Sequence, residues 1–135
     1  MDIKKLISEK KAEFNTNGIN EALLHDSEKA VGVHFGKELT EYLTEYGYLA
    51  YGFVEFYGLN LKQGLKSDLV EQTLYLHKYY PETSTLVAIE NQGEGDYYLV
   101  DSNDWVYEYD SEEKELCSKD VKLFEYIKKR FEAVG

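Results

Sequence analysis

Apolar residues recur at helical spacing through the first third of the chain. Residues 2–14 predict a helix with Asp2 as its N-cap, and residues 20–31 predict a second helix. A third helix is predicted over 37–46, where apolar positions fall three and four residues apart, and Gly47 suits the position just after its end. The chain therefore begins with three short amphipathic helices.

The pattern then changes to aromatic and β-branched runs, with one further helical segment. Residues 50–57 predict a strand that ends at Gly58, and residues 68–80 predict a helix that starts at Ser67 or Asp68 and stops before Pro81. The remaining predicted elements are strands over 85–91, 97–101 and 105–110 and a closing helix over 119–133.

This order of elements defines the expected fold class. Helices come first, a short antiparallel meander follows, and a helix closes the chain, which is typical of an α+β protein with helices packed on one face of its sheet. The 135 residues fit one domain over 1–135, and this length can bury a core without disulfides or metals. With one proline and one cysteine, the chain has no proline-rich linker and no internal disulfide.

The acidic residues are concentrated in one part of the chain. The net charge is −11, which argues against binding nucleic acid or anionic membrane through a basic patch. Residues 90–120 hold eleven acids and two bases, and so contribute −9 of that charge. The acids are Glu90, Glu94, Asp96, Asp101, Asp104, Glu108, Asp110, Glu112, Glu113, Glu115 and Asp120.

Aromatic residues are interleaved with these acids, which permits two interpretations. A surface of acids and aromatics suits the docking of Lys and Arg side chains from a basic protein partner. Strand alternation predicts the same sequence if the aromatics are core and the acids are a solvated face. On the first interpretation the partner-binding residues are Glu94, Asp96, Asp101, Asp104, Trp105, Tyr107, Glu108, Asp110, Glu112 and Glu113.

No catalytic or metal-binding pattern stands out. His25, His34 and His77 have no zinc-ligand spacing with one another or with Cys117, and we interpret them as structural or surface histidines. Acidic neighbours disfavour a nucleophilic thiolate at Cys117, which we place at the junction between a loop and the last helix. We therefore expect no enzyme, no metal and no cofactor.

A second class of function remains open from the residues alone. The 13 tyrosines favour an aromatic-lined pocket between helices and sheet, as in a regulatory or adaptor domain that binds a small ligand. Such a pocket would involve residues such as Tyr51, Phe53, Trp105 or Tyr107. The start of the chain lacks the apolar region of a signal peptide, and no stretch is long enough to span a membrane, so we expect a cytoplasmic protein.

The order of short motifs resembles that of the SUKH superfamily. The resemblance runs from about residue 20 to the end, and Gly36 departs from it, since the family usually has a proline just before its third helix. The matching positions are Glu28, Val31–Val33, Leu39–Leu43, Gly47, Phe56–Leu59, Gly93, Asp96, Tyr98, Leu99, Asp101, Val106, Tyr107, Asp110, Phe124 and Phe131.

The resemblance carries its own expectations. SUKH members include cell-wall-assembly regulators in yeast and immunity proteins that neutralise polymorphic toxins in bacteria. The family implies an α+β scaffold with a variable binding surface and no shared catalytic residues. It further implies a cognate toxin as partner, often a basic nuclease, with which the acidic segment is compatible.

Overall fold

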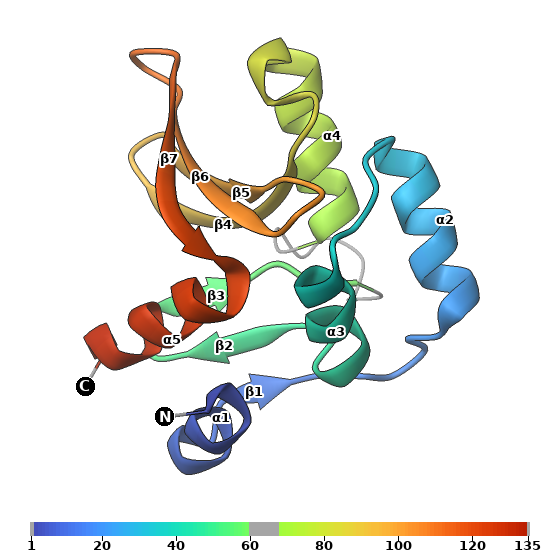
Figure 1. Cartoon of the computed structure of the whole chain (residues 1–135), viewed down its shortest axis with the longest axis vertical. Helices are drawn as coiled ribbons and strands as arrows, with labels where there is room; N and C mark the ends of the chain where they lie inside the picture. The colour runs from blue at the N-terminus through green and yellow to red at the C-terminus, as the bar shows by residue number, and fades with distance from the viewer. Residues whose placement is uncertain (1, 60–67, 135) are drawn as a thin grey trace.

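A computed structural model of the chain describes residues 2–59 and 68–134 (Figure 1). Helices predominate in the first part of the chain, four consecutive strands precede the last helix, and both sheets are antiparallel. The elements are α1 (Ile3–Lys10), β1 (Glu13–Phe14), α2 (Glu21–Val31), α3 (Lys37–Glu45), β2 (Leu49–Tyr51), β3 (Val54–Phe56), α4 (Leu69–Tyr79), the 3-10 turn η1 (Pro81–Thr83), β4 (Val87–Gly93), β5 (Asp96–Val100), β6 (Trp105–Asp110), β7 (Glu115–Lys122) and α5 (Leu123–Val134).

The strands form two sheets that meet at one point. β1, β2 and β3 make a small sheet in chain order, and β4 to β7 make a larger meander in chain order. The Tyr57 N–H, just after β3, donates to the Ile89 carbonyl of β4 over 2.8 Å. This hydrogen bond connects the small sheet to the large one.

Helices cover both faces of the larger sheet, and not one face alone as the sequence predicted. On one face Tyr80, at the end of α4, packs against Tyr109 of β6. On the other face Tyr126 of α5 stacks on Tyr98 of β5 at 5.3 Å between ring centroids. Figure 1 shows α4 and α5 on either side of the sheet, with the β6–β7 loop projecting at the top of the view.

The fold class and most predicted elements are confirmed. The chain is α+β with antiparallel sheets, and helices occur where 20–31, 37–46 and 68–80 predicted them. Asp68 caps α4 through the Glu71 N–H, whereas the alternative cap, Ser67, lies outside the described residues. The predicted sheet is two sheets, because the first predicted strand folds as a separate hairpin instead of extending the meander.

The first helix is shorter than predicted. It ends at Lys10, and Lys11 has a left-handed backbone with φ of 53°. Residues 13 and 14 pair with β2 as strand β1, and the Phe14 side chain is exposed instead of completing a helical stripe. The predicted helix over 2–14 is therefore wrong beyond residue 10, because pairing with β2 outweighs local helical spacing.

The predicted strand over 50–57 is a hairpin. Gly52 has φ of 58° and, with the exposed Phe53, forms the turn between β2 and β3. Glycine adopts this backbone without the steric cost that a Cβ atom adds. An aromatic-rich run thus conceals a turn.

The closing helix begins later than predicted, and a strand precedes it. Residues 115–122 form β7, which pairs with β6, and α5 starts only at Leu123. Cys117 consequently lies within a strand and not at a loop–helix junction. The error has a physical source: β7 is exposed on both faces, so its sequence carries no alternation of apolar and polar residues.

Asp104 joins the larger sheet to the helical half of the chain. It lies in the β5–β6 turn, and its two carboxylate oxygens accept the Glu38 and Leu39 N–H groups at the start of α3 over 2.9 and 3.0 Å. The helix residue that would normally supply this cap is Gly36, which has no side chain to do so. A Cβ atom on Gly36 would lie 2.3 Å from an Asp104 oxygen, so glycine makes room for the carboxylate.

We expect Asp104→Ala to lower the free energy of unfolding by about 2 kcal/mol, because it removes a helix cap and leaves two N–H groups without an acceptor. Urea denaturation measures the change. Gly36→Ala should destabilise the protein in the same way by displacing the carboxylate. Asn103→Ala is the matched control, because Asn103 is exposed in the same turn. Its hydrogen bond to Asp101 comes from the backbone N–H, which alanine keeps. A stability loss in the control equal to that of Asp104→Ala would contradict the capping role.

Candidate protein-binding surface

The two faces of β6 carry different chemistry. Residues directly opposite one another on antiparallel strands share a face of the sheet. Tyr97 lies opposite Tyr109, and Tyr109 is fully buried against α4. Asp110 lies opposite Asp96, on the other face. The interleaved aromatics and acids of the sequence are thus largely separated onto opposite faces, as strand alternation requires.

The acids of three adjacent strands lie side by side on the face that α5 only partly covers. Asp96, Asp110 and Glu115 form one row across β5, β6 and β7, and Glu108 lies on the same face in the next row beside Cys117. We call Asp96, Glu108, Asp110 and Glu115 the acidic face. Glu112 and Glu113 are exposed in the loop that joins β6 to β7, at the end of this face.

The acidic face is short of neutralising partners. Burial, together with the charges of Glu108, Asp110 and Glu94, raises the pKa of Asp96 above its ordinary value. Among the described residues, the only ion pair of the acidic face joins Glu108 to Lys119 at 3.4 Å. Like charges directly opposite in a sheet destabilise it, so this arrangement opposes folding and would be relieved by a basic partner.

Two acids of the charged segment are not on the surface. Glu90 is buried, receives three charge-assisted hydrogen bonds from Arg130 of α5, and accepts the Tyr126 hydroxyl hydrogen over 2.5 Å. Asp104, a predicted binding residue, exposes 4% of its surface and caps α3. We therefore remove Asp104 from the set of surface candidates.

The other predicted binding residues are spread around the hairpins. Asp101 is half-buried and organises the β5–β6 turn by accepting the Asn103 and Trp105 N–H groups. Glu94 is exposed in the β4–β5 turn. These two residues lie at opposite ends of strand β5, so the structure does not bring the whole predicted set together.

Trp105 and Tyr107 point away from the acidic face. Trp105 is 40% exposed, and the Lys122 ammonium lies 5.3 Å from its ring centroid. Tyr107 is half-buried, and its hydroxyl donates to Asp101. Neither residue is fully buried core, and neither shares a face with Glu108 or Asp110.

The free edge of β7 is a feature that the sequence did not reveal. No described strand pairs with its outer side, and seven of its eight residues are exposed. The Ser111 N–H donates to the Gly95 carbonyl, which makes Asp96 and Asp110 a non-hydrogen-bonded pair. By alternation along the ladder, the backbone groups of Leu116 and Ser118 point outward, available to an added strand.

The predicted aromatic pocket does not form as one site. Tyr51 lines a hollow with Lys11, and Phe53 lines a separate hollow with Tyr57. Neither hollow reaches Trp105 or Tyr107. Of the residues that the sequence suggested for an aromatic pocket, Tyr51 and Phe53 thus line hollows, and the small-ligand alternative stays a prediction.

The described part of the chain presents little that resembles a catalytic or metal centre. His77 Nε2 lies 2.7 Å from the Leu86 carbonyl, His34 pairs with Glu28 at 3.0 Å, and His25 is exposed. Within residues 2–59 and 68–134, no three His, Cys, Asp or Glu side chains are grouped so as to hold a metal ion. None of the helices in these ranges combines the length and apolar character needed to span a membrane.

The comparisons with known proteins establish the family. The SUKH_5 family model, described as SMI1-KNR4 cell-wall, matches residues 2–132, and the chain belongs to this family. The earlier resemblance to the SUKH superfamily is thereby confirmed, and it extends further toward the N-terminus than residue 20.

A solved structure supports the fold independently. The chain is similar to a protein from Pseudomonas syringae pv. tomato with a TM-score of 0.59 and 18% sequence identity, over 78% of this chain and 81% of that one. At this identity the similarity shows a shared fold. No curated protein sequence matches the chain.

The acidic face makes a prediction about stability and pH. Because folding raises the pKa of Asp96, the folded state holds this proton more tightly than the unfolded state, and the ionised carboxylate opposes folding at neutral pH. Asp96→Asn should therefore raise the melting temperature at about pH 7, and the gain should vanish below the ordinary pKa of about 3.9. Asp26→Asn, on the exposed side of α2, should show no such gain. A neutral-pH melting temperature that Asp96→Asn leaves unchanged or lowers would contradict this account.

Proposed function

We propose that this chain is an immunity-type protein that binds and neutralises a basic bacterial toxin domain in the cytoplasm without catalysing a reaction. Family membership supports a protein-binding role of this kind. The observation that carries the proposal is the acidic face, where four carboxylates on three adjacent strands form a single ion pair with the described residues, that of Glu108 with Lys119. A partner rich in Lys and Arg would stabilise these charges and would be steered toward them.

The position of the acidic face suits a large partner. The hairpin of β6 and β7 projects from the body of the molecule, and its loop adds the exposed Glu112 and Glu113 (Figure 1). An exposed surface on a projecting hairpin favours contact with another protein over enclosure of a small substrate. Masking a toxin requires occupation of a surface and no chemical step.

Long-range attraction gives the first test of the proposal. The candidate to test as partner is the product of the gene adjacent to the one that encodes this chain. Its association rate with the protein is measured by stopped flow. The variant Asp96→Asn, Glu108→Gln, Asp110→Asn, Glu115→Gln should associate more slowly than the native protein. Its association rate should also depend less on salt, because salt acts on this attraction by shortening the Debye length from about 10 Å at 0.1 M to about 3 Å at 1 M.

A control with the same change of charge isolates the position of the acids. The control variant neutralises four exposed acids elsewhere, namely Glu9, Glu21, Asp26 and Glu132. If net charge alone governs association, the two variants behave alike, and the acidic face is only a solvated surface. Absence of binding to the adjacent gene product would overturn the proposed partner.

Cys117 offers an independent test, because it is the only cysteine and lies on the acidic face beside Glu108. Partner binding should slow alkylation of Cys117 by a maleimide at least tenfold, as followed by mass spectrometry. The control is Cys117→Ser combined with Ser8→Cys, which moves the thiol to the exposed side of α1. Equal protection at both positions, or at neither, would place the partner elsewhere.

A further inference from the structure

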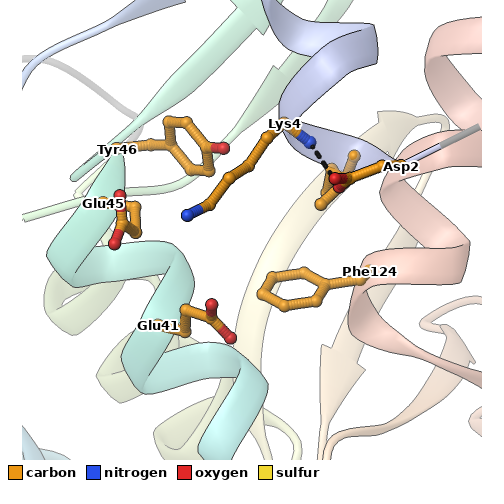
Figure 2. Close-up of a pocket in the computed structure, with 7 residues that line it drawn as sticks. Asp2, Lys4, Glu41, Glu45, Tyr46 and Phe124 are labelled. Atoms are coloured by element: carbon orange, nitrogen blue, oxygen red, sulfur yellow. Dashed lines mark hydrogen bonds between the residues drawn. The ribbon is translucent and has the colours of Figure 1, made fainter.

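A pocket lies between α1, α3 and α5 (Figure 2). These helices lie away from the β6–β7 loop (Figure 1). It has a volume of about 330 Å³, which suits a small molecule or one side chain. Its lining combines carboxylates with aromatic rings. The lining residues are Asp2, Ile3, Lys4, Glu41, Glu45, Tyr46 and Phe124.

Tyr46 supplies the observation that points to a ligand. Its side chain is almost completely enclosed, with 9% of the residue exposed, yet its hydroxyl is directed into the pocket (Figure 2). No described residue forms a hydrogen bond with this hydroxyl. Burial raises the pKa of Tyr46, and the charges of Glu45, Asp2 and Glu41 raise it further. The group is therefore a neutral hydroxyl, in a pocket that three carboxylates also line, and it is available as a donor or an acceptor.

The charges around this hydroxyl favour a cation. Asp2, Glu41 and Glu45 face a single basic residue, Lys4, so the lining carries a net charge of −2. The Lys4 ammonium extends into the pocket between Tyr46 and the α3 carboxylates (Figure 2), yet it forms no ion pair within 4 Å with any described residue. The position of Lys4 thus shows that an ammonium group fits in the pocket. The Lys4 ammonium itself is not neutralised there by an ion pair with a described residue.

The aromatic walls select the kind of cation. Phe124 lies across the pocket from Glu45, and the Tyr46 ring forms the adjoining wall (Figure 2). Ring faces attract ammonium and guanidinium groups and pack against apolar stems. A metal ion would instead require several oxygen ligands converging on one point, and the described residues form no such group.

We propose that this pocket binds a small organic cation, a primary ammonium or guanidinium group on a short apolar stem. The charged head group of this cation lies between Glu41 and Glu45, and binding involves no proton transfer. The Tyr46 hydroxyl orients the head, and the stem lies along the ring of Phe124. The bound cation displaces the Lys4 ammonium toward solvent. This site is separate from the acidic face and does not depend on the proposed toxin partner.

Agmatine and spermidine are suitable probes, because they carry these head groups on alkyl stems. The isotope-labelled full chain is titrated with each amine at constant ionic strength, and amide chemical shifts are followed by NMR. We expect saturable shifts confined to residues around the pocket, such as Lys4, Glu45 and Tyr46. The neutral analogue butanol should produce none of them.

Variants give the proposal its sharpest test. Glu45→Gln should weaken agmatine binding about tenfold and Tyr46→Phe about threefold, since each removes one contact to the head group. Lys4→Met should strengthen binding at least threefold, because it removes the competing ammonium. Lys5→Met is the matched control on the same helix, since Lys5 is exposed and does not line the pocket. A purely structural role of Lys4 would lower stability without strengthening binding.

Two results would overturn the proposal. One is the absence of saturable shifts at about 10 mM amine, where even a weak specific site would be largely filled. The other is a response spread over all acidic residues, with Lys4→Met and Lys5→Met indistinguishable, which would show charge screening only. Both measurements use the protein without a partner, so they succeed or fail independently of the toxin experiments.

Discussion

Three carboxylates bind groups that are distant in the sequence, and they hold helices to the larger sheet and to one another. Asp104 of the β5–β6 turn caps α3, and Glu38 at the start of α3 accepts the Phe124 N–H at the start of α5 over 2.8 Å. Glu90 of β4 then binds Arg130 and Tyr126 of α5. Each carboxylate satisfies backbone or charged groups that burial would otherwise leave unpaired. The position of α5, and with it the extent of the uncovered sheet, follows from these contacts.

Because α5 is held near Tyr98, it covers one end of the sheet face and leaves the other end open. At the open end, Glu108 pairs with the partly exposed Lys119, and Asp110 accepts the N–H groups of Glu112 and Glu113 in the β6–β7 loop. Among the described residues, Asp96 and Glu115 form no ion pair. Glu90 and Asp96 lie on neighbouring strands of the same sheet, yet one stabilises the fold and the other opposes it. A carboxylate stabilises the fold where a cation or a helix N-terminus binds it. A carboxylate without such a partner is available to bind another protein.

The acidic face and the pocket also use negative charge in different ways. The acidic face is open and projects from the body, so its charge acts at long range on a large partner. In the pocket, the exposed Glu41 and Glu45 lie near the largely buried Tyr46, so their charge acts over short distances on a group bound there. The same acidic protein thereby presents one surface suited to a large basic protein and one pocket suited to a small organic cation.

The sequence by itself determined the α+β class, the helices over 20–31, 37–46 and 68–80, the family resemblance and the concentration of acids in 90–120, because spacing and composition are local properties. Only the tertiary structure decided that Asp104 is a buried cap, that residues 115–122 pair as β7, and that acids and aromatics occupy opposite faces of β6. These outcomes depend on partners distant in the chain. A carboxylate or a polar strand has no local pattern that reveals which backbone it will meet.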